Sequence, residues 1–394
     1  MIKETKGYSY NDLTILPAFI STVSSRSECD VYDNNGMLPI FASPMASVVN
    51  VKNYDVFKDN KIYSIIPRNI DINDRISEML EGKWIALSLK EFEFYFIDYI
   101  DKRLANYKGT CRICVDIANG HMKSLYEKCW KAKNKAKSYN YKLIIMTGNI
   151  ANPETYEWIC KFNFDNNDKI INYIRVGIGG GSGCLTTSNT SIHMPQASLI
   201  EECYKIKKFR GFYNYNNKDV FPYIVADGGI RNYDHVIKAL ALGADYVMIG
   251  GLFAQMVESA GDKYMVSNYT VGNTIKKSYQ YIDLSIYSDF KVDNNNLITM
   301  KDKNNDQISH YIEVKFFGMA SADGQKSISG EKTKTSEGIT KFLPVKYTLK
   351  GWIKNMISYL QSAMSYTNCK TLNGFIGSPE LIVNSISEIN AVNK

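Results

Sequence analysis

Eight short apolar runs, separated by longer amphipathic segments, constrain the fold of this 394-residue chain more than any other feature. Short apolar runs bounded by turn residues are typical of strands buried on both faces of a parallel sheet. The runs are 38–42, 63–66, 84–87, 111–116, 143–147, 173–176, 223–226 and 246–249. Helical patterns lie between them, for example at 71–80, 122–136 and 233–242. Eight strand–helix units over about 250 residues predict a (β/α)₈ TIM barrel, with an open doubly wound sheet as the alternative.

Residues suited to a binding site follow nearly every run, which favours the barrel. The C-terminal ends of barrel strands carry the active site. The segments concerned are 43–45, 67–69, 116–120, 148–149, 177–186, 227–229 and 250–251.

The segment after the sixth run contains five glycines and then Cys184, in Gly177-Ile-Gly-Gly-Gly-Ser-Gly-Cys184. Glycine allows positive φ and a close approach of the backbone to a ligand. A plain turn with a small buried side chain at its end is the alternative for such a fragment. A dinucleotide fingerprint does not fit, because the spacing differs and no amphipathic helix with a later acidic residue is evident. We expect Cys184 to lie at the mouth of a site.

Two further glycine pairs predict a phosphate site. Gly228 and Gly229 follow the seventh run, and Gly250 and Gly251 follow the eighth, where barrel loops commonly bind phosphate through backbone amides. A phosphomonoester is therefore expected. Asp227 would repel a phosphate, so it is expected to accept hydrogen bonds from a ribose diol.

The pattern changes after residue 262. Residues 263–312 are rich in Tyr, Asn and Asp and predict an insertion containing a β-hairpin. Residues 316–345 are polar and charged, which is typical of a solvated loop or of a flap that closes on the active site. A closing amphipathic helix is expected from Trp352 to Ser365. The whole chain, 1–394, is expected to form one catalytic domain.

Composition excludes several classes of protein. The net charge of +7 comes from scattered lysines, which favours an anionic small ligand over nucleic acid. The eight cysteines show no metal-binding spacing, and Cys111 and Cys114 are expected in the core. No signal peptide or membrane-spanning run is found, so a soluble, cytoplasmic protein without a membrane partner is expected.

With these motifs aligned, the chain resembles the family of IMP dehydrogenases and GMP reductases from about Tyr8 to Leu372. The segments that carry the resemblance are 25–30, 116–120, 148–149, 177–186, 227–229, 250–251, 318–319 and 336–338. The resemblance implies a homotetramer in which Cys184 is the nucleophile.

Three features favour the reductase branch. Residues 70–83 leave no room for the paired CBS regulatory domain of most dehydrogenases, and the flap lacks their Arg-Tyr pair. Residues 116–120 and 335–338 look like reductase forms. Departures from the reductase pattern are Met45-Ala46-Ser47-Val48 after strand one, Arg68 in place of a lysine, Lys334 in place of an arginine, and Leu185 in place of a threonine.

The resemblance implies NADPH-dependent reductive deamination of GMP to IMP and ammonia, with Thr186 and Glu337 moving the proton. Besides Asp227 and the two glycine pairs, the implied substrate ligands are Ser182, Gly318, Met319, Ser321, Lys334, Ser336 and Gly338. The implied NADPH ligands are Ser25, Arg26, Arg68, Asp116, Ile117, Ala118, Ile178 and Gly179. Carbonyls of Gly179, Gly181 and Cys184 are expected to bind a monovalent cation such as K⁺. The alternatives are IMP dehydrogenase, a reductase of a modified purine nucleotide, and a barrel that binds a purine nucleotide without turnover.

Overall fold

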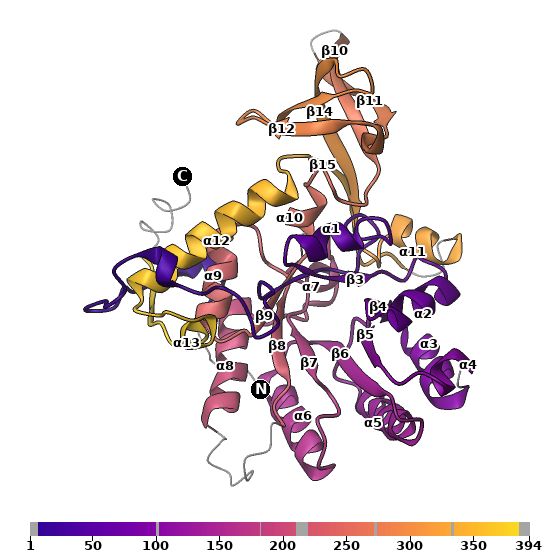
Figure 1. Cartoon of the computed structure of the whole chain (residues 1–394), viewed down its shortest axis with the longest axis vertical. Coiled ribbons are helices and arrows are strands. Elements are labelled where there is room, and N and C mark those ends of the chain that lie inside the picture. The colour runs from indigo at the N-terminus through magenta and orange to yellow at the C-terminus, as the bar shows by residue number, and fades with distance from the viewer. Residues whose placement is uncertain are drawn as a thin grey trace.

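Eight parallel strands form a closed barrel in chain order (Figure 1). The structure is a computed structural model, and it describes residues 7–99, 102–181, 183–209, 220–271, 274–331 and 335–385. The last barrel strand pairs with the first, which closes the sheet. The strands are β2 (Ile40–Ala42), β3 (Tyr63–Ile66), β4 (Trp84–Leu87), β5 (Thr110–Val115), β6 (Lys142–Ile150), β7 (Tyr173–Val176), β8 (Tyr223–Asp227) and β9 (Tyr246–Ile249). The predicted (β/α)₈ barrel is confirmed, and the open doubly wound sheet is wrong.

All eight predicted runs coincide with barrel strands, with small differences in the bounds of four of them. Strand β2 begins at Ile40, two residues later than predicted, because Pro39 has no amide hydrogen to donate and the amide of Leu38 bonds to the carbonyl of Lys61. Strand β6 continues to Ile150 past a register shift after Gly148.

Helices surround the barrel, and three of them begin at a side-chain N-cap. Asp71 accepts a hydrogen bond from the amide of Asn73 at the start of one helix, and Asn152 accepts one from Glu154 next to Pro153 at the start of another. The helices are α1 (Tyr54–Asp59), α2 (Ile72–Leu80), α3 (Leu89–Glu93), α4 (Lys102–Ala105), α5 (Lys123–Ser138), α6 (Pro153–Asp165), α7 (Thr186–Thr190), α8 (Gln196–Phe209), α9 (Tyr233–Ala241) and α10 (Gly251–Ala254).

Aromatic side chains close the N-terminal end of the barrel. Five strands begin with an aromatic residue, namely Tyr63, Trp84, Tyr173, Tyr223 and Tyr246. All of them except Tyr223 contact Phe41, whose ring lies 4.9 Å from that of Tyr63 and 5.4 Å from that of Tyr246. The hydroxyl of Tyr63 donates to Asp33 at 2.6 Å. Because this end is packed, a ligand site is left to the opposite end.

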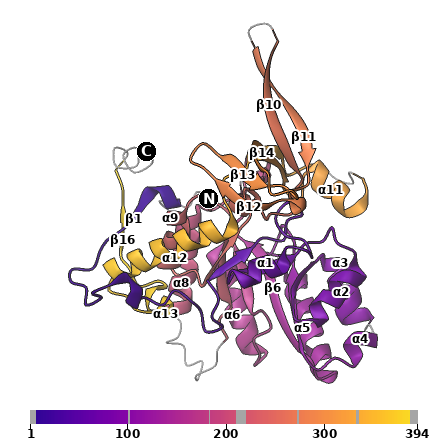
Figure 2. The same cartoon turned by 45° about the horizontal axis from the view of Figure 1, so that its top comes forward.

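Residues 263–317 form an antiparallel sheet that lies at one end of the molecule (Figure 1). The sequence predicted only a hairpin, which is present as the projecting pair β10–β11 (Figure 2). The Asn-rich tracts are turns, with positive φ at Asn296 and Asn305, and they separate additional strands. Ile298, Met300 and Val314 are buried in a small core of this sheet. The strands are β10 (Lys263–Val271), β11 (Thr274–Ile282), β12 (Ser288–Val292), β13 (Leu297–Lys301) and β14 (Gln307–Phe317).

The 316–345 segment leaves this sheet and returns to it. It contains α11 (Ala322–Ser329) and β15 (Thr340–Pro344), and β15 pairs with β14. The predicted closing helix is α12 (Leu349–Tyr366), followed by α13 (Leu372–Phe375). Near the two ends of the described chain, β1 (Leu13–Ile15) pairs with β16 (Leu381–Val383). In the described part of the chain, no helix has the length and hydropathy needed to cross a bilayer.

Candidate active site

A cavity of about 240 Å³ opens at the C-terminal end of the barrel strands. Loops after β2, β5, β7, β8 and β9 line it, together with the end of β6 and the 316–345 segment. The predicted site residues that line it are Asp116, Ala118, Ile178, Gly179, Gly181, Cys184, Thr186, Asp227, Gly228, Gly229, Gly250, Gly251, Gly318, Met319, Glu337 and Gly338. Sequence positions spread over more than half of the chain therefore meet in one place.

Cys184 is the exposed cysteine among the eight, as expected for a thiol at the mouth of a site. Its Sγ lies 3.2 Å from Oγ1 of Thr186 and accepts a hydrogen bond from the Thr186 amide at 3.5 Å. The other cysteines are buried, and burial raises the pKa of both Cys111 and Cys114 to about 12. Their predicted place in the core is confirmed.

The carboxylate of Glu337 reaches the same place from the 316–345 segment. Thr186 donates to Oε2 of Glu337 at 3.2 Å, which joins thiol, hydroxyl and carboxylate in one chain of contacts. Backbone bonds fix the arrangement, because the amide of Leu185 donates to the Glu337 carbonyl at 2.8 Å and that of Ile339 donates to Gly183 at 3.1 Å. The three predicted catalytic residues are thus adjacent.

Glycines let the cysteine loop touch its neighbours. A Cβ at Gly338 would lie 2.9 Å from the Gly183 carbonyl oxygen, and one at Gly177, where φ is +129°, would lie 2.3 Å from the Asp227 carbonyl oxygen. Only glycine permits both contacts without displacing backbone.

A buried guanidinium joins two carboxylates on the cavity wall. Arg175 on β7 donates from Nη1 to Oδ1 of Asp116 at 2.7 Å and from Nε to Oδ2 of Asp227 at 2.9 Å. Asn149 donates to the same Oδ2 of Asp227 at 2.7 Å. Among the described residues, the hydrogen bonds and ion pair of the Asp227 carboxylate all fall on Oδ2, which leaves Oδ1 available to a ligand hydroxyl.

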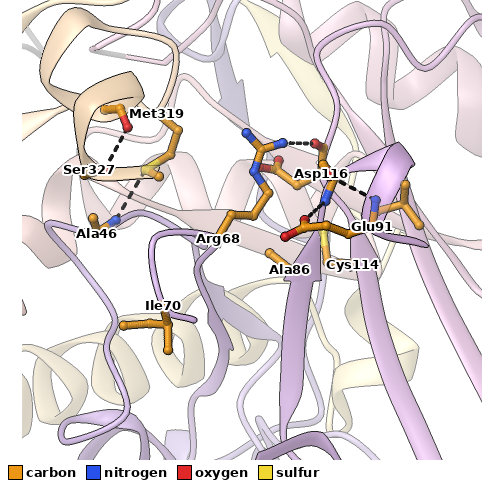
Figure 3. Close-up of polar contacts among 12 residues, drawn as sticks. Ala46, Arg68, Ile70, Ala86, Glu91, Cys114, Asp116, Met319 and Ser327 are labelled. Atoms are coloured by element: carbon orange, nitrogen blue, oxygen red, sulfur yellow. Dashed lines mark hydrogen bonds and ion pairs between the residues drawn. The ribbon is translucent and has the colours of Figure 1, made fainter. Parts of the chain in front are cut away.

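Arg68 also contacts Asp116 (Figure 3). Its Nη1 donates to the Asp116 carbonyl at 3.0 Å, and its Nε lies 3.8 Å from Oδ2 of that carboxylate. Burial alone would raise the pKa of Asp116, but the charges of Arg175 and then Arg68 outweigh burial and hold it below the ordinary value. Asp116 is therefore an ionised group against the cavity.

The glycine amides predicted to bind phosphate are not all available. The amide of Gly229 donates to the Gly180 carbonyl at 2.9 Å, so it holds the β7 and β8 loops together. For the amides of Gly228 and Gly250, no acceptor is found among the described residues. These two can receive an anion.

Several predicted ligands do not line the cavity. Arg26 donates to Ser362 on α12 at 3.4 Å, and Ser25 caps the short helical turn that Arg26 begins. Ile117 packs on the hydrophobic core, Ser321 caps α11, and the Ser336 hydroxyl bonds to the Gly338 carbonyl. Arg68 acts through Asp116 rather than lining the space itself. Ser182 and Lys334 lie outside the described residues.

Two other predicted site residues, Met319 and Gly181, lie at the cavity. Met319 lines the cavity, and its Sδ accepts a hydrogen bond from the amide of Ala46 at 3.4 Å (Figure 3). The carbonyl of Gly181, expected to bind a cation, accepts the amide of Cys184 at 3.0 Å. A carbonyl oxygen has two lone pairs, so one remains for a cation.

Sequence reasoning assigned no role to several residues that line the cavity, among them Asn149, Arg175, Arg231 and Phe316. Asn149 lies in a segment expected at the site and counted in the resemblance, but it was given no ligand, and Arg175 was counted within an apolar run. The signal for Arg175 was available, since a charged residue inside a buried strand must face a partner. Arg231 and Phe316 carried no such signal, because only the fold brings them to the site.

Comparison with known proteins agrees with this geometry. Residues 101–286 match the family described as IMP dehydrogenase / GMP reductase domain. Residues 101–286 therefore carry the domain of this family. It is 24% identical over 370 residues to a protein named GMP reductase from Caenorhabditis elegans, covering 89% of this chain and 85% of that protein. A GMP reductase from Shewanella pealeana is 23% identical over 94% of this chain and 93% of its own length. One from Helicobacter pylori is 28% identical over 65% of this chain and 73% of its own length.

Proposed function

We propose that this protein is a GMP reductase that converts GMP, with NADPH, to IMP and ammonia. The observation that carries the proposal is the contact chain from Cys184 through Thr186 to Glu337 beside a nucleotide-sized space. A protein that only binds a nucleotide does not need a thiol, a hydroxyl and a carboxylate in this order. The names of the relatives agree with a reductase.

The phosphate of GMP is placed at the amides of Gly228 and Gly250, with Gly251 beside them. Asp227 holds the ribose through Oδ1, since its other oxygen is occupied by Arg175 and Asn149. The Gly318-Met319 segment and Gly338 bracket the base. This pose directs C2 of the purine toward the sulfur.

Cys184, as thiolate, forms a bond to C2 of the purine. The C2–N bond to the exocyclic amino group then breaks, and the nitrogen leaves as ammonia with a proton relayed by Thr186 and Glu337. NADPH supplies the hydride that C2 then accepts. Breaking the C2–S bond returns the thiolate and releases IMP, so each product atom is accounted for.

The wall formed by Asp116, Ala118, Ile178 and Gly179 suits the nicotinamide end of NADPH. Ser25 and Arg26, which the resemblance assigns to the 2′-phosphate, do not line this cavity within one chain. Carbonyls of Gly179, Gly181 and Cys184 would hold a monovalent cation such as K⁺ and stabilise the cysteine loop. The proposal also includes a cytoplasmic location and assembly into a homotetramer. Light scattering after size-exclusion chromatography measures the mass of the assembly and so tests the tetramer.

The deciding experiment offers purine monophosphates to the purified protein with NADPH and follows NADPH oxidation and ammonia together. The proposal expects GMP to give equal amounts of oxidised cofactor and ammonia. NADH formation from IMP and NAD⁺ would instead identify a dehydrogenase. A higher kcat/KM for another purine nucleotide would identify a different substrate. Modified purine nucleotides are included in the panel because Arg68 and Ala46 depart from the reductase pattern. Nucleotide binding without turnover would identify the protein as a barrel that binds a purine nucleotide in a regulatory role.

A further inference from the structure

Arg175 is a buried cation that lines the cavity, with 8% of its surface exposed. It lies on β7, which pairs with β6 on one side and β8 on the other. Its Nε and Nη2 lie 2.9 and 2.8 Å from Oδ2 of Asp227 at the end of β8. Its Nη1 donates at 2.7 Å to Oδ1 of Asp116, which follows β5. One guanidinium therefore joins carboxylates from two separate parts of the cavity wall.

A glycine on the strand between them makes room for this bridge. To reach Asp116 from β7, the Arg175 side chain passes β6, which lies between β5 and β7 in the barrel. Gly148 of β6 is in register with Arg175, and a Cβ there would lie 2.9 Å from the Arg175 Cβ. That separation is well inside ordinary carbon–carbon contact. A side chain at position 148 would therefore displace the arginine and break the bridge.

The two carboxylates serve different ligands in the proposed pose. Asp227 keeps Oδ1 for the ribose of the nucleotide, because its hydrogen bonds fall on Oδ2. Asp116 lies on the wall that we assign to the nicotinamide end of the cofactor. A guanidinium presents its donors in one rigid plane, so a change in the orientation of one carboxylate changes the donors that the other receives. Binding at one carboxylate should therefore change the affinity at the other.

We propose that Arg175 is a positioning residue that couples nucleotide binding at Asp227 to cofactor binding at Asp116, so that each ligand raises the affinity for the other. The identity of the two ligands rests on the proposed function. The coupling is favourable because a ribose held by Asp227 fixes Arg175, and a fixed Arg175 holds Asp116 in place. The second ligand then meets a wall that is already ordered, which lowers the cost of binding.

The test measures the affinity of the full-length protein for NADP⁺ by calorimetry, with and without saturating GMP. This pair gives no turnover, because NADP⁺ has no hydride to donate to GMP. In the wild type, GMP should raise the affinity for NADP⁺ by a factor on the order of 5 to 150, the range typical of coupled sites. NADP⁺ should raise the affinity for GMP by the same factor, since coupling of two binding sites is reciprocal.

Two variants break the bridge without leaving a buried charge unpaired. Arg175→Lys keeps the charge but replaces the planar fork by one ammonium, which cannot bind both carboxylates in the same way. Asp116→Asn cuts the bridge at its other end and leaves Arg175 paired with Asp227, so it decides the matter if Arg175→Lys does not fold. In both variants the coupling factor should fall toward unity, while the affinity for GMP alone changes much less.

Arg112→Lys is the matched control, because Arg112 is also an arginine of a barrel strand. It lies on β5 and donates to the Gly82 carbonyl at 3.1 Å, and it does not line the cavity. This variant should keep the coupling factor of the wild type. Loss of coupling in Arg112→Lys to the same extent as in Arg175→Lys would contradict a specific role for the bridge.

Two results with the GMP pair would overturn the proposal. One is independent binding of GMP and NADP⁺ by the wild type, even if the protein reduces GMP. The other is an equal loss of both affinities in Arg175→Lys with the coupling factor unchanged, because a purely structural role gives that result.

Failure of the proposed function gives a different result. If the wild type releases no ammonia from GMP, the same titrations use IMP and NADH, a pair that a dehydrogenase would bind without turnover. Coupling of this pair that is lost in Arg175→Lys and kept in Arg112→Lys supports the inference. Independent binding of the two ligands, or binding of neither, rejects it.

Discussion

At the scale of single residues, the site depends on side chains that come from distant parts of the chain. Thr186 and Glu337 are 151 residues apart and lie 3.2 Å from each other. The sequence predicted this pair through the family resemblance and not through geometry. It did not predict Arg175, whose role depends on which face of β7 it occupies. It placed Arg26 at the cofactor, although in one chain that side chain reaches α12.

Replacing Glu337 by Gln should lower kcat on the order of 10²-fold to 10⁴-fold, since a positioned acid–base group contributes this much. KM for GMP should change much less, because the carboxylate serves proton transfer more than binding. Steady-state NADPH oxidation measures both constants. Glu127→Gln on α5, an exposed carboxylate, is the control, and an equal loss in that variant would remove the proton relay from the account.

The Asp116 carboxylate should make stability depend on pH in the acid range. Its pKa is held low in the folded protein, so the unfolded chain takes up a proton first as pH falls. Its contribution is complete above the ordinary carboxyl pKa of about 4 and is lost as pH falls through the lower folded value. Urea unfolding of wild type and Asp116→Asn from neutral to acid pH measures this. A stability difference that stays constant across the range contradicts the assignment.

At the scale of elements, the 316–345 segment is held between two structures. Strand β15 fixes one end in the antiparallel sheet, and backbone bonds from Leu185 and Ile339 fix the middle on the cysteine loop. The barrel elements could be predicted from sequence because each apolar run is continuous and bounded by turn residues. The antiparallel sheet could not, because its strands alternate polar and apolar residues and its asparagine turns resemble irregular loop.

Gly338→Ala tests the contact between the segment and the cysteine loop. The added methyl would lie 2.9 Å from the Gly183 oxygen and 3.0 Å from the Ser321 nitrogen, so backbone must move. A displacement near 1 Å at a catalytic group costs up to about 10²-fold in rate. We expect kcat to fall toward that extent while thermal stability changes little. Gly374→Ala on α13, distant from the cavity, should keep full activity, and normal kcat in Gly338→Ala would show that the contact is not needed.

At the scale of the whole molecule, the two ends of the barrel have different roles. Aromatic rings fill the N-terminal end, and the cavity occupies the other, so packing and chemistry are separated along the barrel axis. The antiparallel sheet supplies the wall that carries Phe316 and leads to Glu337. This division predicts that the two ends respond differently to mutation.

Phe41→Ala should destabilise the protein by about 3–5 kcal/mol, as removal of a buried aromatic ring does. Phe41 is 1% exposed and contacts rings from four other strands. The folded variant should keep its KM for GMP close to that of the wild type, because the cavity lies at the opposite end of the barrel from Phe41. Chemical unfolding and kinetics measure the two effects, with half-exposed Phe94→Ala as the control. A large change in KM without loss of stability would contradict the separation.

The most direct test of the account is the rate of GMP-dependent NADPH oxidation, with ammonia release, in Cys184→Ser. The matched variant is Cys369→Ser, because the Cys369 thiol donates to the carbonyls of Thr367 and Gly374 and a hydroxyl can do the same. The account predicts a loss on the order of 10³-fold or more in Cys184→Ser, as expected for removal of a covalent nucleophile, with Cys369→Ser close to wild type. Near-normal turnover by Cys184→Ser would contradict the covalent step on which the proposed function depends.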